Sequence, residues 1–409
     1  MSMHPMKALL NLDEGLRILL DSTIPIERTE QVALPDAAGR VLAETVTAPL
    51  DVPPFARAAM DGYAVLAQNT FGAGNFTPAL LRMLEAVHAG DLATTEVAAG
   101  TCIQVATGSP VPPGADAVVQ VEDTEVEGDG RAGATVKFYS PVYPGQNISA
   151  QGKDIRAGHQ VLAPGVRLDP SKIGVLAALG VTQVAVYARP GVAVVPSGNE
   201  IVPPGQPLPP GKIYDINSFT LSALIRDNGA TPAVLPIMAD TLEDVRRSLT
   251  RAAEEHDLVV ISGGSSVGER DVMVQAVEEL GELKFHGIAV KPGKPTLCGL
   301  VRGTLVLGMP GYPTSCLTNG YGLLVPVLRK LARLPERRTG GVTLPMSRRY
   351  TSTIGRHQYL PIRIEQGEVV PVFKESGAIT SMADAEGYIE IPANVDLVER
   401  GERVRVTFF

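Results

Sequence analysis

From residue 191 onward the chain alternates short apolar runs with longer helical patterns, and this alternation constrains the fold more than any other feature. The apolar runs predict strands at residues 192–195, 233–237, 258–261 and 305–307. The intervening patterns predict helices at residues 218–228, 242–255, 271–280 and 314–331. Such alternation is typical of a parallel sheet that has helices on both faces and strands buried on both sides. We therefore predict a doubly wound, mostly parallel α/β domain over residues 189–334.

The sequence on either side of this domain is β-rich. Residues 26–189 contain short β-type runs between Gly and Pro turns, apart from a helical pattern between residues 170 and 179. A charged segment at residues 329–338 is interpreted as a linker, and the alternating pattern after it predicts a small C-terminal β-barrel. The predicted domains are an N-terminal helical and linker domain at 1–50 and 141–188, an inserted β-rich domain at 51–140, the α/β domain at 189–334 and the barrel at 335–409.

Composition excludes several classes of protein. The 409 residues carry a net charge of -8, which disfavours nonspecific nucleic-acid binding because that requires a basic face. One local group of basic residues remains, and with its proline it is interpreted as a solvated linker: Arg329, Lys330, Arg333, Arg337, Arg338, Arg348 and Arg349. Three isolated cysteines, no secretion signal and no apolar stretch of membrane-spanning length predict a soluble, cytoplasmic protein without membrane contact.

Unusual loops follow the predicted strands, at the sheet edge where open parallel sheets bind ligands. They lie at residues 196–200, 238–240, 262–271 and 308–313. Glycine allows backbone N–H groups to approach an anion closely, and the N-terminus of a following helix adds partial positive charge. A fifth loop, at residues 291–295, adds Lys291 and Lys294 between prolines. Together these loops predict a phosphate-binding site, although any one of them could equally be a tight turn.

Three carboxylates accompany these loops, namely Glu200, Asp240 and Asp271. An acid at a helix start is usually a solvated cap. Gathered at one sheet edge beside a phosphate, the three would instead suit Mg²⁺, which takes carboxylate and phosphate oxygens. We predict Mg²⁺ at this edge. The six histidines show no zinc-ligand spacing, and no nucleophile elbow or Walker motif is present.

Taken together, the motifs resemble the MoeA family of molybdopterin molybdenumtransferases, which is related to the last domain of gephyrin. In the N-terminal half the motifs are DVPPF at 51–55, AMDGYAV at 59–65, ATGSPVP at 106–112, GQNI at 145–148 and GKDI at 152–155. In the α/β part they are SGNE at 197–200, IYDIN at 213–217, SGGSSVGERD at 262–271, KPGKP at 291–295 and MPGYP at 309–313.

The resemblance implies a fold, a reaction and partners. The α/β domain is expected to be similar to MogA, the molybdopterin adenylyltransferase, and to bind molybdopterin. The reaction is the insertion of molybdate or tungstate into adenylylated molybdopterin, with Mg²⁺-dependent cleavage of the pyrophosphate and release of AMP. The implied partners are a second copy of the chain, in a homodimer formed through residues 1–50 and 141–188, and the adenylyltransferase and molybdoenzymes before and after this step.

Site residues are carried over by position. Candidate catalytic residues are Asp61, Thr107, Asp154, Glu200, Asp240 and Asp271, of which the last three also bind the metal; in the family the first three face the α/β cleft across the dimer. Candidate substrate-binding residues are Ser197, Gly198, Asp215, Asn217, Ser262, Gly263, Gly264, Ser266, Gly268, Lys291, Lys294, Pro310, Gly311, Pro313 and Ser376. Asp61, Thr107 and Asp154 also have local alternatives as turn, strand-end and loop-capping residues.

Four positions depart from the family pattern: Ala58 replaces Ser, Lys153 replaces Glu, Asn199 replaces Asp and Tyr312 replaces Asn. The choice between molybdate and tungstate stays open. Two other functions are also consistent with the motifs, namely the preceding adenylylation of molybdopterin and a gephyrin-like scaffold without catalysis. The extra β-rich domains favour insertion over adenylylation, because the adenylyltransferase has a single domain, and the retained acids favour catalysis.

Overall fold

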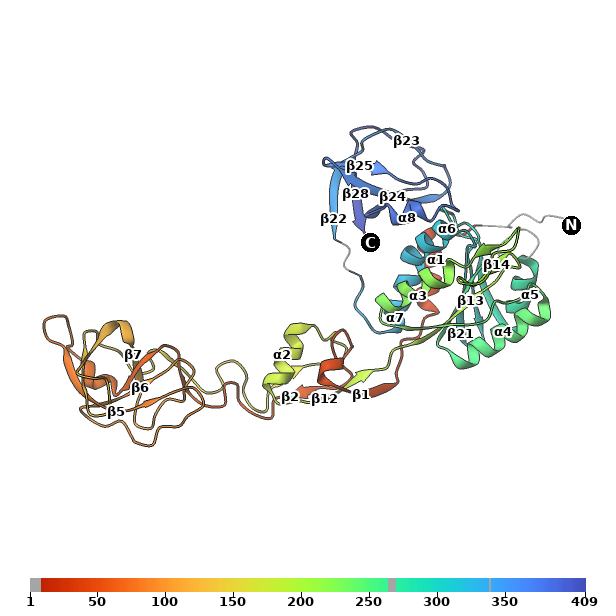
Figure 1. The fold of residues 1–409 in the computed structure, drawn as a ribbon. Helices are drawn as coiled ribbons and strands as arrows, with labels where there is room; N and C mark the ends of the chain where they lie inside the picture. Colours follow the sequence, from red (N-terminus) through yellow and green to blue (C-terminus); the bar gives the residue numbers. More distant parts are fainter. Residues whose placement is uncertain (1–8, 264–269, 338–339) are drawn as a thin grey trace. The chain divides into compact units, whose positions relative to one another are not determined.

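The computed structural model describes residues 9–263, 270–337 and 340–409, without the side chains of Arg270 and Asp271. The chain divides into two compact units (Figure 1). Unit 1 comprises Met1–Val32, Gly39–Ala43 and Ala185–Phe409, and unit 2 comprises Ala33–Ala38 and Glu44–Val184. The chain changes unit four times: within β1 (Thr29–Ala33), after Ala38, after Ala43 and within β12 (Gln183–Tyr187), which pairs with β1.

Unit 1 is built around a six-stranded sheet. Its order is β16 (Thr231–Val234), β13 (Gly191–Pro196), β17 (Leu258–Ser262), β21 (Thr304–Met309), β20 (Leu297–Val301) and β18 (Gly281–His286). The first four strands are parallel, and β20 and β18 extend the sheet in antiparallel fashion. The predicted mostly parallel α/β domain is confirmed, while the two antiparallel strands are additional to the prediction.

Helices cover both faces of this sheet (Figure 1). Helices α4 (Leu242–Glu255) and α5 (Arg270–Leu280) pack on the face that carries Val195 and Ile261. The opposite face, which carries Val194 and Val260, is covered by α1 (Leu12–Asp21), α3 (Asn217–Asp227) and the helical segment after β21. Successive residues of one strand enter opposite cores, and this double burial is the reason why the strands are continuously apolar.

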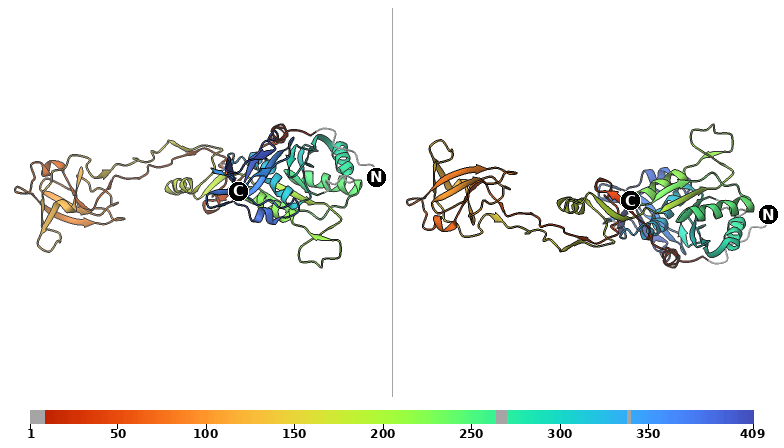
Figure 2. Two further views of the ribbon diagram at one scale, coloured as in Figure 1. Left: turned by 90° about the horizontal axis from the view of Figure 1, so that it is seen from above. Right: turned by 90° about the horizontal axis from the view of Figure 1, so that it is seen from below.

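Strand β16, at one edge of the sheet, begins and ends earlier in the chain than predicted. Strand β16 covers Thr231–Val234 rather than residues 233–237. As an edge strand it accommodates Pro232, and Pro236 cannot donate to a longer ladder because proline has no N–H. A short parallel pair, β14 (Ile201–Val202) with β15 (Ile213–Tyr214), was also not predicted. The loop between them projects from the domain (Figure 2).

The predicted helix at residues 314–331 is divided into three parts. Helix α6 (Pro313–Asn319) is followed by a π-helical turn (Gly320–Leu324) and by α7 (Val325–Leu331). Pro326 lacks the N–H that would bond to the carbonyl of Gly322. A Cβ atom at Gly322 would lie 2.9 Å from the Tyr359 hydroxyl, so glycine at this position leaves room for Tyr359.

The prediction that residues 329–338 form a solvated linker is wrong for three of the cations. Arg329 donates from Nε to Pro335 O at 2.8 Å, and Lys330 donates from Nζ to Leu20 O at 2.6 Å. Arg333 donates from Nε to Ile26 O. Leu20 lies in the last turn of α1, at the negative end of the helix dipole; its carbonyl accepts from Thr23 N at 3.0 Å as well as from Lys330. Lys330 therefore joins α7 to the end of α1, Arg333 joins the segment after α7 to the segment after α1, and Arg329 closes the turn that follows α7.

The C-terminal domain is β-rich, as predicted. Its sheet contains β24 (His357–Glu365), β26 (Gly387–Ile391), β28 (Arg403–Phe408) and β22 (Gly341–Pro345), with β25 (Glu368–Pro371) also on β24. The short strand β19 (Val290–Lys291) of the α/β domain joins this sheet beside β24. A smaller pair, β23 (Tyr350–Thr351) with β27 (Leu397–Val398), and helix α8 (Thr380–Ala383) complete the domain.

Unit 2 contains the predicted N-terminal β-rich part. Its sheet order is β7 (Ala117–Gln120), β4 (Gly62–Val65), β6 (Thr101–Val105), β5 (Ala79–Val87), β9 (Thr135–Phe138) and β8 (Thr124–Glu127). Two-stranded pairs join β2 (Val46–Thr47) to β11 (Gln160–Leu162) and β3 (Arg57–Ala58) to β10 (Ile148–Ser149), and α2 spans Pro170–Ala178. Tyr63 and Phe138 meet edge to face in its core. The four domain boundaries stay a prediction.

Asp257 at the start of β17 generates a prediction about stability. It accepts hydrogen bonds from Arg28 at 2.6 and 2.8 Å and from Gly191 N at 2.7 Å. Burial raises its pKa, but the bonds from Arg28 and Gly191 together outweigh burial and keep the pKa of Asp257 below its ordinary value. We expect Asp257→Asn to lower the free energy of unfolding by about 1–3 kcal/mol at neutral pH.

Because the folded-state pKa of Asp257 is lowered, its stabilising effect is complete above the unfolded-state value and is lost as the pH falls through the folded-state value. Chemical denaturation at neutral pH and at decreasing acid pH should show the difference between wild type and Asp257→Asn shrinking. Asp21→Asn, which breaks the exposed Arg17 pair, is the matched control, with an expected loss below about 1 kcal/mol. An equal loss for both variants would contradict the assignment.

Candidate active site

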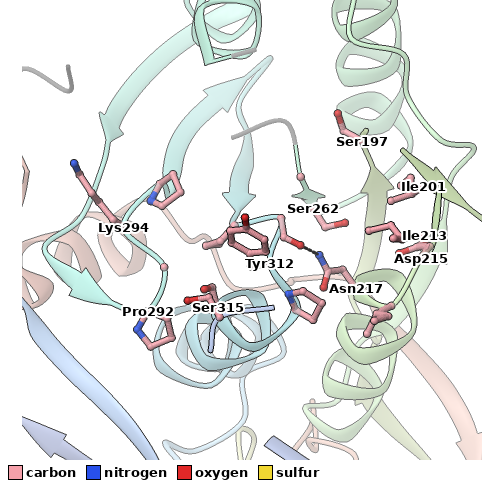
Figure 3. A pocket seen from close by; sticks show the side chains of 18 of the residues that line it. Ser197, Ile201, Ile213, Asp215, Asn217, Ser262, Pro292, Lys294, Tyr312 and Ser315 are labelled. Atoms are coloured by element: carbon pink, nitrogen blue, oxygen red, sulfur yellow. Dashed lines mark hydrogen bonds between the residues drawn. The ribbon is translucent and has the colours of Figure 1, made fainter. Parts of the chain in front are cut away.

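A pocket of about 640 Å³ opens in unit 1 at the carboxyl ends of β13, β17 and β21. The loops after these strands supply Ser197, Gly263 and residues 310–313. The loop after β19 supplies residues 291–295, and the C-terminal domain supplies Arg356 and Ser376. Figure 3 shows Ser197, Lys294 and Tyr312 around the pocket, each from a different element. The pocket therefore lies at the predicted edge of the sheet.

The structure brings most of the predicted α/β-domain residues together. Those that line the pocket are Ser197, Glu200, Asp215, Asn217, Ser262, Gly263, Lys291, Lys294, Pro310, Gly311, Pro313 and Ser376. Gly198 and Asp240 adjoin it through Ser197 and Glu200. Gly264, Ser266 and Gly268 lie outside the described residues, as does the side chain of Asp271, whose backbone is in the first turn of α5. The roles assigned to all of these residues stay predictions.

One part of the pocket is cationic. Lys291, Lys294 and Arg356 line it together, and Lys291 Nζ donates to Thr353 Oγ1 at 2.8 Å. In the part of the chain that the structure describes, none of these three cations forms an ion pair with a carboxylate. Their positive charge is therefore available to an anionic ligand.

The loop that carries the two lysines is held by Asn319 of α6. Asn319 Nδ2 donates to Gly293 O at 2.9 Å and to Thr296 Oγ1 at 2.8 Å. Gly293 has a φ of +107°, and a Cβ atom there would lie 2.4 Å from Asn319 Nδ2. The close approach requires glycine, because any side chain would strain the backbone and displace Asn319.

Another part of the pocket presents buried polar groups. Asp215 is 8% exposed and accepts from Ser218 N at 3.0 Å. Asn217 is 7% exposed and donates from Nδ2 to Gly311 O at 2.8 Å, the bond drawn in Figure 3. Among the described residues Asn217 Oδ1 has no hydrogen-bond donor. A buried acceptor without a donor suits a ligand N–H or O–H.

A second unpaired acceptor lies beside the loop after β13. Ser197 Oγ donates to Asp240 Oδ1 at 2.9 Å, while the buried Asp240 Oδ2 has no hydrogen-bond donor within the described ranges. A Cβ atom at Gly263 would lie 2.1 Å from Ser197 O, so the two loops approach more closely than any other residue type allows. The described residues contain no group of three His, Cys, Asp or Glu side chains that could hold a metal ion, and the predicted Asp271 carboxylate is not among them.

The predicted residues of the N-terminal half lie in unit 2. Thr107 donates to Asp61 Oδ1 from its backbone N at 2.6 Å and from Oγ1 at 2.9 Å. These two bonds, led by that from the backbone N–H, lower the pKa of Asp61. Asp154 lies in another loop, where its backbone N donates to Val52 O at 3.0 Å. Of these three predicted residues, Asp61 and Thr107 therefore contact each other through two hydrogen bonds, whereas Asp154 lies in a different loop.

Several pocket residues were missed by the sequence analysis. They include Ile201, Ile213, Tyr214, Ser315 and Arg356. Ser315 follows the MPGYP motif by two residues and could have been included on that ground. Arg356 lies 62 residues beyond Lys294 in a β-rich region without a binding motif, and only the packing of the two domains brings it to the pocket.

Comparison with known proteins adds to this geometry. Three family profiles match: "MoeA N-terminal region (domain I and II)" at residues 10–180, "Probable molybdopterin binding domain" at 193–330 and "MoeA C-terminal region (domain IV)" at 343–409. "Molybdopterin molybdenumtransferase 2" of Mycobacterium tuberculosis is 34% identical over 387 residues, which are 92% of this chain and 94% of that protein. The chain belongs to the MoeA family.

Further similarities agree with membership of the MoeA family. A putative molybdopterin biosynthesis protein of Methanocaldococcus jannaschii is 33% identical over 93% of this chain and 92% of its own length. The crystal structure of a molybdopterin biosynthesis MoeA protein from Pyrococcus horikoshii has a TM-score of 0.84 and 40% identity, and the match covers 98% of this chain and 99% of that chain.

Structure gives the surroundings of the four departures from the MoeA pattern. Ala58 is 1% exposed in unit 2, and Lys153 is exposed in the same unit. Asn199 is exposed, and its carbonyl accepts from Lys212 Nζ. Tyr312 is 67% exposed and lines the pocket. Only Tyr312 therefore changes the lining of the pocket. No helix in the described ranges is long and apolar enough to cross a membrane.

The hydrogen bonds from Asn319 to the loop at residues 291–295 and to Thr296, which we call the Asn319 clamp, generate a prediction. Gly293→Ala should force Asn319 away from the loop and weaken binding of an anion such as pyrophosphate by about tenfold or more, since misplacement of a positioned group is costly. Isothermal titration with pyrophosphate measures the effect. Gly303→Ala is the matched control, because Gly303 also has a positive φ, of +85°, but has open space around its Cβ position. Equal affinities for the two variants would contradict the role of the clamp.

Proposed function

We propose that this chain is a molybdopterin molybdenumtransferase that inserts molybdate or tungstate into adenylylated molybdopterin and releases AMP. Membership of the MoeA family and the curated names of the relatives support this reaction class. The single observation that carries the proposal is the pocket at the loop edge of an α/β sheet. Among the described residues it combines a buried acceptor that has no donor, Asn217 Oδ1, with three cations that form no ion pair. Its volume is in the range of small-molecule sites.

The cations suit both anionic parts of the reaction. The substrate contains a pyrophosphate, and the incoming metal arrives as an oxyanion. The Arg356 guanidinium can donate two parallel N–H bonds to such oxygens, whereas Lys291 and Lys294 act as point charges. Ser315 and Ser376 line the same pocket and add hydroxyl donors. We assign this part of the pocket to the phosphates and the oxyanion.

The buried polar part suits the remainder of the substrate. A pterin or an adenine carries amino or amide N–H groups, and a ribose carries hydroxyls. Asn217 Oδ1 and the Asp215 carboxylate can accept from them. Recognition of this kind is specific, because a ligand that lacks the donor leaves a buried acceptor unpaired.

We propose Mg²⁺ as the cofactor, with Glu200, Asp240 and Asp271 as the residues that would hold it. The free oxygen of Asp240 supports this, because a buried carboxylate oxygen without a donor is costly unless a cation is its partner. Ser197 holds the other oxygen and so orients the carboxylate. When bound, Mg²⁺ would offset phosphate charge during hydrolysis of the P–O–P bridge, which consumes one water.

The participation of unit 2 is also proposed. We infer that Asp61, Thr107 and Asp154 act in the same reaction, from the second copy of a homodimer, because the family resemblance implies it. The lowered pKa of Asp61 supports an ionised carboxylate at neutral pH. Cytoplasmic location and exchange of cofactor with the adenylyltransferase and with molybdoenzymes are proposed on the same resemblance. Light scattering should give twice the chain mass of 43.1 kDa.

The reaction is tested by AMP release. Purified protein supplied with adenylylated molybdopterin, Mg²⁺ and molybdate should release AMP at a rate that depends on molybdate. Arg356→Ala should lower the rate by about 100-fold, because it removes a donor that stabilises developing phosphate charge. Lys284→Ala is the matched control; Lys284 pairs with Glu282 on β18 and does not line the pocket.

Other results would redirect the assignment. Absence of molybdate-dependent AMP release would refute insertion. ATP consumption with molybdopterin would then indicate the adenylyltransferase reaction, and tight binding of a protein partner without turnover would indicate a scaffold.

The cation site gives a separate prediction. Asp240→Asn should raise the Mg²⁺ concentration needed for half-maximal AMP release by about tenfold or more, because the unpaired carboxylate oxygen becomes an amide. Asp244→Asn is the control: Asp244 lies four residues on, in the first turn of α4, and pairs with Arg247. A Mg²⁺ dependence that is the same for both variants and for wild type would exclude Asp240 as a ligand.

A further inference from the structure

Two tyrosines line the pocket, and they differ in exposure and in the hydrogen bonding of their hydroxyls. Tyr214 is 39% exposed and donates from its hydroxyl to Gln206 O at 3.0 Å. Tyr312 is 67% exposed, and its hydroxyl has no hydrogen-bond partner among the described residues. Figure 3 shows the Tyr312 ring within the pocket, between Lys294 and Asn217. The fold therefore leaves a large aromatic side chain free inside a ligand site.

The backbone that carries Tyr312 is firmly held. On one side Gly311 O accepts from Asn217 Nδ2 at 2.8 Å. On the other side Thr314 N donates to Ser376 O at 3.0 Å, and Thr314 Oγ1 donates to Ala378 O at 2.8 Å. Tyr312 O itself accepts from Cys316 N at 2.8 Å at the start of α6, and Pro313 has a fixed φ. The position of the ring is therefore fixed at its base.

The ring is also supported on one side by the C-terminal domain. A Cβ atom at Gly377 would lie 3.7 Å from Tyr312 Cδ1 and 4.0 Å from Cε1, so the backbone of Gly377 lies close beside the ring. The remaining ring surface is exposed within the pocket. A supported aromatic ring with an open surface has the form of a stacking platform.

We infer that Tyr312 is a ligand-binding residue that stacks on a planar N-heteroaromatic ring of the ligand. This inference rests on the proposed function, since the adenylylated substrate has two such rings, an adenine and a pterin, each connected to phosphate. A ring on Tyr312 would place its attached phosphate in a pocket that also contains Lys294 and Arg356. Stacking is tolerant of ring identity because every such ring has a π face.

Binding experiments distinguish the two rings. Wild type, Tyr312→Ala and Tyr312→Phe are titrated with AMP, with molybdopterin and with molybdate alone. Tyr312→Ala should bind one of the two ring ligands about 5- to 100-fold more weakly. Weaker AMP binding identifies the adenine, and weaker molybdopterin binding identifies the pterin. Tyr312→Phe should bind as wild type does, and the molybdate affinity should be unchanged in both variants.

The chain offers a direct reporter as well, because it contains no tryptophan. Tyr312→Trp introduces a single one at the platform, and its emission should change when the stacked ligand binds. Tyr143→Trp is the matched control, since Tyr143 is also 67% exposed but lies in unit 2 and does not line the pocket. Its emission should not respond to AMP or molybdopterin.

Three outcomes overturn the inference. Tyr312→Ala could bind both ring ligands as wild type does, it could lose molybdate affinity to the same extent as it loses ring-ligand affinity, or wild type could bind neither ring ligand. Failure of the proposed function is a different result. If Tyr312→Ala weakens ring binding but wild type shows no molybdate-dependent AMP release, the platform is supported and the reaction is refuted. If wild type releases AMP and Tyr312→Ala matches it in binding, the reaction is supported and the platform is refuted.

Discussion

The pocket depends on the short parallel pairing between β19 and β24, because this contact joins the C-terminal domain to the α/β domain. Lys291 pairs with Gln358, and the neighbouring Tyr359 is only 6% exposed within the core around the α/β sheet. Burial of a large side chain stabilises such a contact by about 1.5–3 kcal/mol. The pairing also sets the lysine loop and Arg356 in one pocket. The cationic character of the site is therefore a product of tertiary packing, since neither domain alone contains all three cations.

The distribution of charge along the chain is consistent with an anion site in unit 1. Unit 2 contains eight basic and fifteen acidic residues, a net charge of -7, so unit 1 accounts for only -1 of the total of -8. A nearly neutral unit can present a local excess of positive charge without a long-range negative field of its own. The overall acidity that disfavours nucleic-acid binding therefore does not oppose binding of a small, phosphorylated ligand to the pocket.

The sequence was sufficient to predict the parallel sheet because its strands are buried on both faces and are therefore continuously apolar. It was insufficient for β18 and β20, although these are as long as β13 and β17. Strand β18 is half exposed, and Gly299 interrupts the apolar run of β20, so neither pattern is distinctive. The loops at the strand ends could be identified because close approach requires glycine, as Gly263 shows against Ser197. Arg356 could not be identified, because no local pattern marks a residue whose role depends on another domain. The role of Arg329 and Lys330 was missed because a turn brings Pro335 O to Arg329, and the packing of α1 on α7 brings Leu20 O to Lys330.

The unpaired acceptors explain why the pocket is a functional feature rather than a defect of packing. Asn217 Oδ1 and Asp240 Oδ2 are buried without donors in the described part of the chain, and each such atom costs about 1–3 kcal/mol of stability. In both cases the rest of the side chain is fixed, by Gly311 O and by Ser197 Oγ respectively. The free oxygens therefore cannot turn toward another donor among the described residues without breaking these bonds. A ligand that supplied an N–H to Asn217 Oδ1, and the Mg²⁺ proposed for Asp240 Oδ2, would recover this cost on binding. The protein without its ligands would then be less stable, and it would select for ligands that carry these groups.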